Sequence, residues 1–110
     1  MKIAQRVIVI DSKQVYQYSK DLNILYVEDD LDLKEATLEI FKDFFKTVQS
    51  AVDGVDALNK YNEFYEKNGK HFDIVVTDIE MVKMTGIELI KEIHIINKDQ
   101  EIIVVSAYSD

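Results

Sequence analysis

The sequence predicts an α/β fold, a doubly wound parallel sheet with helices on both faces. Short β-rich runs alternate with longer segments whose apolar residues recur every three or four positions, which is typical of βαβ units. The chain has 110 residues, the length of one domain, and 47% of them are hydrophobic, enough to build a core.

Four segments have the composition of core strands. Residues 23–27 form a nearly continuous apolar run, which suits a strand that is covered on both faces, and residues 72–77 form another. Residues 47–52 are more polar, so we expect that strand at an edge of the sheet. Residues 102–106 form the last predicted strand.

The first predicted helix spans residues 31–46. Asp30 precedes it as a suitable N-cap, and Asp32 and Glu35 suit the positive end of the helix dipole. Its apolar residues recur at helical intervals, and they are Leu33, Ala36, Ile40, Phe41, Phe44 and Phe45.

Two further helices are predicted. One opens at Asp53-Gly54 and ends near Asn68-Gly69, where a glycine can terminate it. The other spans residues 87–97, after a loop that contains Gly86. We expect this last helix to face the core with Ile90, Ile93 and Ile96.

Charge and cysteine content exclude several classes of protein. With 21 acidic and 13 basic residues the net charge is −8, which argues against a nucleic-acid or membrane-surface partner. The absence of cysteine excludes disulfide scaffolds and thiolate sites, and two histidines are too few for a multi-histidine zinc site. No apolar run is long enough to span a bilayer, and no signal peptide is evident, so we expect a cytoplasmic protein.

Acidic residues follow two of the most apolar predicted strands. Glu28 and Asp29 follow the first, and Asp78 follows the strand at 72–77. In a parallel sheet ligands bind at the carboxyl ends of the strands, so neighbouring strands would bring these acids together. Carboxylates so close repel one another unless a cation lies among them, and Mg²⁺ is the natural choice. The alternative is that each acid only caps a helix.

A hydroxyl group follows the last strand. Ser106 and the small Ala107 would lie at the same edge of the sheet, where a hydroxyl and a backbone N–H suit a phosphoryl group held on Asp78. On its own this signal is weak, because a serine at a strand end commonly serves as a cap.

These segments together resemble the receiver domain of bacterial two-component response regulators. The resemblance covers about residues 22–110 and rests on several motifs in the same order and at the same separations. They are residues 24–30 (ILYVEDD), 53–58 (DGVDAL), 72–81 (FDIVVTDIEM), 86–89 (GIEL) and 102–110 (IIVVSAYSD).

The resemblance implies a flavodoxin-like fold and a phosphorylation site. Asp78 would take a phosphoryl group from a phosphohistidine on a sensor histidine kinase. Asp29 would bind Mg²⁺ directly, Glu28 less directly or through water, and the backbone carbonyl of Glu80 would complete the shell together with Asp78. Ser106 would contact the phosphoryl oxygens and move when they arrive, and Ala107 would supply its N–H. Beyond self-phosphorylation and slow dephosphorylation, the resemblance implies no enzyme activity.

The chain departs from the family pattern at two places. Val82 stands where the family usually carries a proline. The fifth βα unit, with the lysine that pairs with the phosphoryl group, is missing, so we expect a domain over 22–110 that is truncated after its fourth strand and leaves an apolar edge exposed.

Residues 1–21 form an amino-terminal extension. Its β-branched run at 6–10 predicts an extra strand, which would add to the sheet within the chain or by exchange between two copies, giving a homodimer. The alternative is an ill-ordered extension, or a strand that lies elsewhere.

Three functions remain open at this point. The first is a receiver module that is phosphorylated on Asp78. The second is a receiver-fold interaction or dimerisation module that no longer switches. The third is a Mg²⁺-dependent phosphoryl-transfer enzyme or nuclease built on Glu28, Asp78 and Glu80, which the net charge disfavours.

Overall fold

The computed structural model describes residues 12–79 and 84–105 and contains one parallel sheet. The strands are β1 (Asn23–Val27), β2 (Thr47–Ala51), β3 (Ile74–Asp78) and β4 (Glu101–Val105), in the spatial order β2-β1-β3-β4. The helices are α1 (Ser12–Ser19), α2 (Leu31–Phe44), α3 (Gly54–Asn68) and α4 (Gly86–Ile96). The order of the strands reverses between β1 and β3, as in doubly wound flavodoxin-like folds.

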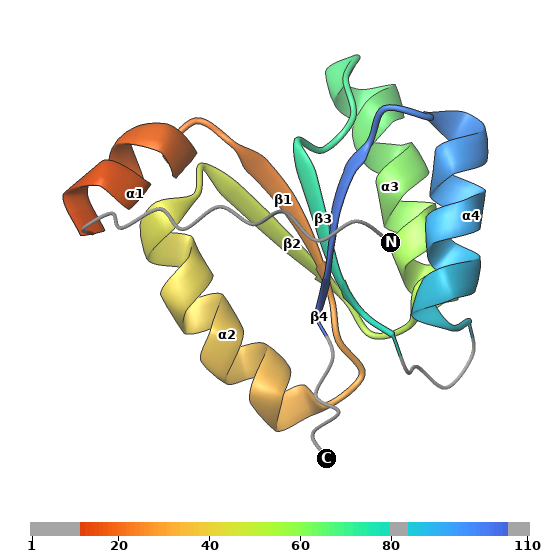
Figure 1. Cartoon of the computed structure of the whole chain (residues 1–110), viewed down its shortest axis with the longest axis horizontal. Coiled ribbons are helices and arrows are strands. Elements are labelled where there is room, and N and C mark those ends of the chain that lie inside the picture. Colours follow the sequence, from red (N-terminus) through yellow and green to blue (C-terminus); the bar gives the residue numbers. More distant parts are fainter. Residues whose placement is uncertain (1–11, 80–83, 106–110) are drawn as a thin grey trace, which may run out of the picture.

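The sheet separates two layers of helices. Figure 1 shows α1 and α2 on one side of the strands and α3 and α4 on the other. Buried side chains follow the same division. Leu25, Val75 and Ile93 belong to a cluster beneath α3 and α4, whereas Ile24 and Tyr26 belong to a second cluster with α2. The β-strands at the centre are therefore covered on both faces, which confirms the prediction for β1.

Local signals set the beginnings and ends of the helices. The Asp30 side chain accepts a hydrogen bond from the Leu33 N–H at 3.0 Å, as predicted for the N-cap of α2. Asp53 caps α3 in the same way, through the Asp56 N–H at 2.8 Å. Gly69 ends α3 with a φ of 71°, a left-handed conformation that favours glycine.

The predicted apolar faces of α2 and α4 are only partly buried. Leu33 and Ile40 on α2 are exposed, and α2 has no buried residue at all, although Phe41 packs on the second cluster. On α4, Ile93 is buried as predicted but Ile96 is exposed. The expectation that Ile96 faces the core was therefore wrong, because periodicity identifies an apolar stripe but not how much of it a neighbouring element covers.

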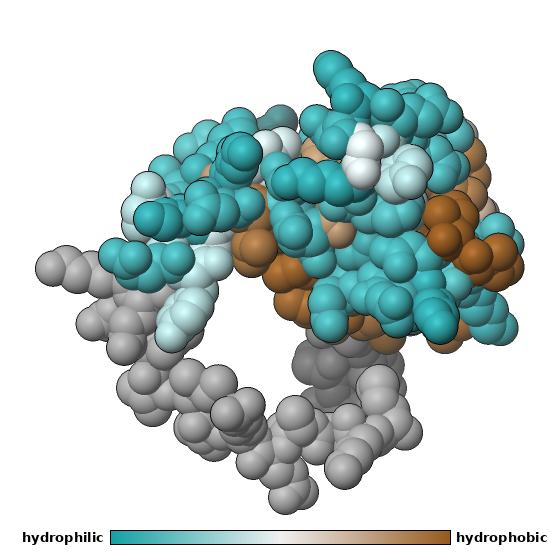
Figure 2. Space-filling view, turned by 90° about the horizontal axis from the view of Figure 1, so that it is seen from above, coloured by the Kyte–Doolittle hydropathy of each residue, from teal (hydrophilic) through white to brown (hydrophobic). Residues whose placement is uncertain are grey.

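Both strands at the ends of the sheet have an open side in the described part of the chain. The edge position of β2 agrees with its polar composition. At the other end Ile103, Val104 and Val105 of β4 are all exposed, as expected for an uncovered last strand. In Figure 2 hydrophobic residues are visible at the surface between the two helical sides. The extension's predicted strand at 6–10 lies outside the described residues.

Candidate functional site

The carboxyl ends of β1 and β3 bring the predicted acids together. The two strands are hydrogen-bonded neighbours, and their register pairs Val27 with Thr77. Glu28 directly follows Val27, and Asp78 directly follows Thr77, so the register places Glu28 and Asp78 side by side. The Glu28 N–H donates to the Ala51 carbonyl at the end of β2 (3.0 Å), which holds this residue in line with the sheet.

Three carboxylates form the resulting cluster. One oxygen from each of Glu28, Asp29 and Asp78 lies within 4.8 Å of the others. Glu28 is buried, while Asp29 and Asp78 are half-buried. The expectation that these acids meet at one point is therefore confirmed, although the roles that we assigned to them remain predictions.

The environment of the cluster raises the pKa of the Glu28 carboxyl. Burial raises the pKa of the Glu28 carboxyl, and the charges of Asp78 and Asp29 raise the pKa further. The Asp30 N–H opposes this effect, because it donates to Glu28 Oε2 at 3.2 Å and favours the charged form. The site therefore disfavours a third negative charge when no cation is present.

The chemistry of these residues fits a divalent cation. Hard ions such as Mg²⁺ prefer oxygen ligands, and they are commonly held by one or two carboxylates that leave other positions for water and phosphate. Here three carboxylates from two adjacent strand ends converge at one edge of the sheet. A cation among them would relieve their mutual repulsion.

Tyr26 is a residue of this region that sequence reasoning missed. Its ring lies edge-to-face against Phe41 of α2, with centroids 5.3 Å apart. Burial raises the pKa of the Tyr26 hydroxyl, a hydrogen bond with Thr37 opposes this effect, and the charges of Glu28 and Asp78 raise the pKa further. The only sequence signal was one aromatic residue within an aliphatic strand.

The backbone around Asp78 is tightly packed against the start of α4. The Gly86 N–H donates to the Ile79 carbonyl at 2.7 Å. A Cβ atom at Gly86 would lie 2.8 Å from the Ile79 Cα and still closer to the Asp78 carbonyl oxygen, so only glycine permits this approach. The Thr77 hydroxyl also donates to the Asp78 carbonyl, at 2.9 Å. The position of the Asp78 backbone is thus fixed from two sides.

Three other predicted site residues lie outside the described residues, and they are Glu80, Ser106 and Ala107. Val82, which departs from the family pattern, also lies there. Their predicted roles remain untested.

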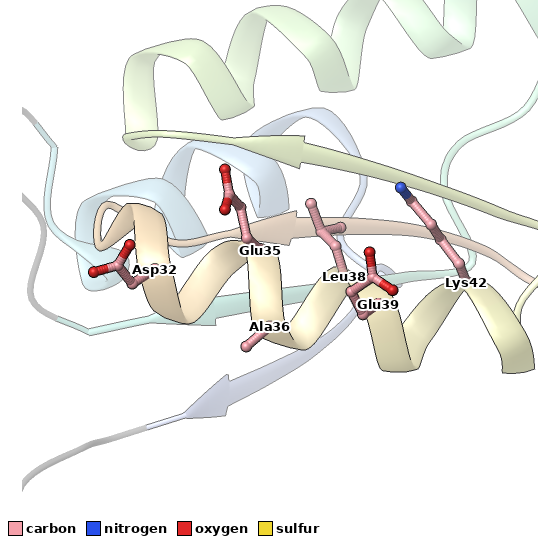
Figure 3. A pocket seen from close by; sticks show the side chains of 6 residues that line it. All are labelled: Asp32, Glu35, Ala36, Leu38, Glu39 and Lys42. Carbon is pink, nitrogen blue, oxygen red and sulfur yellow. The ribbon is translucent and has the colours of Figure 1, made fainter.

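A separate hollow of about 430 Å³ lies along α2. It is lined by Asp32, Glu35, Ala36, Leu38, Glu39 and Lys42. Figure 3 shows Glu35, Leu38 and Lys42 projecting to the same side of α2, whereas Ala36 projects to the opposite side. None of the three clustered acids lines this hollow, so it is distinct from the candidate site.

The sequence matches the family described as response regulator receiver domain over residues 24–110. The chain belongs to this family. The match includes both strand ends of the acidic cluster and excludes α1. Receiver domains are signalling modules of two-component systems, which confirms the family predicted from the motifs.

Curated relatives carry a receiver domain as a small part of a longer chain. The transcriptional regulatory protein ZraR of Klebsiella oxytoca is 33% identical over 90 residues, which are 82% of this chain and 19% of that protein. The sensor kinase CckA of Brucella abortus is 33% identical over 92 residues, which are 84% of this chain and 9% of that protein. This receiver domain thus spans less than a fifth of either relative.

Solved structures share the fold. The chain superposes on CheY of Borrelia burgdorferi, from a complex with CheX, BeF3 and Mg²⁺, with a TM-score of 0.71 and 31% identity, covering 86% of this chain and 69% of that one. It superposes on the response regulator TrrA of Thermotoga maritima, in complex with Mg²⁺ and BeF, with a TM-score of 0.69 and 32% identity, covering 80% and 71% of the two chains.

The remaining sequence features have structural explanations. His71 stacks against the rings of Tyr61 and Tyr65, and His94 contacts the Gln100 carbonyl oxygen at 3.2 Å. Neither histidine joins the acidic cluster. Within residues 12–79 and 84–105, none of the helices has the length and apolar composition to cross a bilayer.

Proposed function

We propose that this receiver domain accepts a phosphoryl group on Asp78 from a phosphohistidine of a sensor histidine kinase. The observation that carries the proposal is the convergence of Glu28, Asp29 and Asp78 at the carboxyl ends of two adjacent strands. Family membership supports it, since the match spans these residues.

The reaction is a transfer between two nucleophiles. A carboxylate oxygen of Asp78 attacks the phosphorus atom, the bond from phosphorus to the donor nitrogen breaks, and an acyl phosphate forms. Mg²⁺, when bound, would offset the negative charge on the transferring group. Asp29 and Asp78 would hold the cation directly and Glu28 less directly or through water, with the Glu80 backbone carbonyl as a further ligand in this proposal.

The anion side of the proposed site comes from β4 and the residues after it. The register pairs Asp78 with Val105, the last residue of β4. Ser106 is the residue that follows Val105 in the sequence. In the proposal Ser106 binds a phosphoryl oxygen and changes position on phosphorylation, and the Ala107 N–H donates to the same group. The proposal includes a cytoplasmic location, the usual one for receiver domains.

Phosphorylation by a small-molecule donor tests this proposal. The purified chain is incubated with acetyl phosphate and Mg²⁺, and its intact mass is measured. We expect a gain of one phosphoryl group that EDTA prevents and that Asp78→Asn abolishes. Asp43→Asn, which removes an exposed carboxylate from α2, serves as the matched control and should retain the gain.

Each other outcome favours a different function. If the wild-type chain takes up no phosphoryl group, the receiver fold serves here as an interaction module. If the chain cleaves DNA in the presence of Mg²⁺, the acidic cluster is a nuclease site.

A further inference from the structure

Gly54, the first residue of α3, is in direct contact with Met84. A Cβ atom at Gly54 would lie 2.7 Å from the Met84 Cγ and 2.9 Å from the Met84 carbonyl oxygen, and it would come still closer to the Met84 Cβ. Real Cβ atoms essentially never approach other heavy atoms within 3.0 Å. Two of these three atoms cannot move without the backbone, so any side chain at position 54 must displace the backbone of Met84.

Met84 belongs to the segment that connects the phosphoacceptor strand to α4. Its side chain also packs on the core cluster beneath α3 and α4. The next residue, Thr85, caps α4 by accepting the Glu88 N–H at 3.2 Å. Gly86 follows, and it is the residue whose backbone lies against Asp78 and Ile79. Met84 is therefore only two residues from Gly86, whose contact with Asp78 and Ile79 fixes the Asp78 backbone.

We propose that Gly54 is a positioning residue for Asp78, acting through Met84 and Gly86. The first turn of α3 sets how closely the segment 84–86 approaches the end of β3, and this distance sets the orientation of the phosphoacceptor. The inference rests on the proposed function for its kinetic consequence, whereas the structural consequence is independent of it.

Helix propensity does not account for a harmful effect of Gly54→Ala, and this makes the substitution an informative test. Alanine is favoured over glycine in helix interiors by about 1 kcal/mol, and Gly54 has no left-handed φ, so the helical backbone gives no reason for Gly54→Ala to be harmful. A harmful effect of this substitution therefore points to the contact with Met84. Misplacement of a reacting group by as little as about 1 Å can cost up to about a hundredfold in rate.

The kinetic experiment compares the wild-type chain with Gly54→Ala and Gly69→Ala. We expect Gly54→Ala to lower the maximal rate of phosphorylation by acetyl phosphate about tenfold, with little change in the half-saturating donor concentration. Gly69→Ala is the matched control, because its left-handed φ of 71° also makes alanine costly but no atom lies within 4 Å of the added Cβ. We expect it to lower the melting temperature and to leave the rate within twofold.

A spectroscopic experiment tests the same contact without phosphorylation. We expect the backbone amide resonances of Asp78 and Ile79 to shift in Gly54→Ala and to stay unchanged in Gly69→Ala. Met84→Ala, which removes most of the side chain resting on Gly54 without adding bulk, should also shift these resonances, and it replaces Gly54→Ala should that variant not fold.

The outcomes separate the two proposals. If the wild-type chain is not phosphorylated, the proposed function fails, and the amide shifts alone decide the inference. If the wild-type chain is phosphorylated but Gly54→Ala reacts at the wild-type rate, or if Gly69→Ala loses the same rate, the inference is wrong. Unchanged Asp78 and Ile79 resonances in the folded variant would also overturn it.

Discussion

Glu28 bears most of the electrostatic cost of the candidate site. It is only 5% exposed, and burial together with two neighbouring carboxylates favours its neutral form, so its pKa is raised. A residue of this kind destabilises the fold when it ionises. Glu28 lies where a bound cation would stabilise its charged form. A carboxyl with a perturbed pKa in such a cluster is typical of functional sites.

Glu28→Gln should therefore raise the stability of the metal-free protein. A carboxyl whose pKa is higher in the folded than in the unfolded state stabilises the fold fully below its unfolded pKa and loses this contribution as the pH rises through its folded pKa. We expect the melting temperature of Glu28→Gln in EDTA to exceed that of the wild type by a few degrees at pH 7.

The pH dependence provides the check on this prediction. The difference between the two proteins should shrink as the pH falls below the unfolded pKa of glutamate, because the wild-type carboxyl is then protonated in both states. Thermal unfolding followed by circular dichroism from pH 4 to 8 measures it. A Glu28→Gln protein that melts at or below the wild-type temperature at pH 7 would contradict this account.

At the scale of elements, Tyr61 joins α3 to the chain that leads into β4. Its side chain is fully buried, and its hydroxyl donates to Gln100 Oε1 at 2.7 Å and accepts from Asn97 Nδ2 at 3.4 Å. The Gln100 amide in turn donates to the Asp73 carbonyl at 3.4 Å, at the start of β3. One hydroxyl thus holds the amino-terminal ends of two strands against a helix.

Tyr61→Phe should cost about 1–2 kcal/mol of the free energy of unfolding, because Gln100 Oε1 loses its buried donor. Urea denaturation measures the loss. Tyr65→Phe is the control on the same helix, since Tyr65 is exposed and its stacking on His71 needs only the ring. That variant should stay within about 0.5 kcal/mol of the wild type, and equal losses in the two variants would refute the role of the hydroxyl.

β4 is the element most suited to pairing with another chain. Ile103 and Val105 lie on the sheet face that α2 covers, because the register pairs Ile103 with Val76 of the α2 cluster, yet both are about half exposed. An apolar strand with an open edge is a template for strand addition. The predicted strand at 6–10 remains our candidate for this role, within one chain or between two copies.

We expect deletion of residues 1–21 to change the mass or the solubility of the protein in solution. Removal of a strand that covers β4 would expose its edge and promote aggregation, whereas removal of an exchanged strand would convert dimers to monomers. Size-exclusion chromatography with light scattering distinguishes these results. A chain starting at Leu22 with unchanged mass and solubility would show that the extension does not cover the sheet.

At the scale of the whole molecule, charge favours the binding of cations. The net charge is −8, and three of the acidic side chains each place a carboxyl oxygen within 4.8 Å of the others at one end of the sheet. Self-repulsion of this kind opposes the compact state. A divalent cation that binds only the folded chain therefore stabilises it by mass action.

Mg²⁺ should raise the melting temperature in a saturable way. At a concentration ten times the Kd the gain is about 1.4 kcal/mol. We expect Asp29→Asn to lose most of this effect and Asp43→Asn to retain it, as measured by thermal unfolding with NaCl added to equal ionic strength. An equal gain in both variants would mean that Mg²⁺ acts through general screening and not at the cluster.

The sequence by itself determined the elements and the identity of the acids. Its apolar runs predicted all four strands within two residues, and N-cap residues such as Asp30 marked the helix starts, because these signals are local. The acids at 28, 29 and 78 were evident because they stand at the ends of apolar strands.

Only the tertiary structure decided which surfaces meet. The neighbouring positions of β1 and β3, and hence the convergence of Glu28 with Asp78, depend on the strand order, which local periodicity does not encode. The exposure of Ile96 was missed for the same reason, since an apolar stripe is buried only where another element covers it. The contact between Gly54 and Met84 joins residues 30 positions apart, and close packing of two backbones leaves no trace in either segment alone.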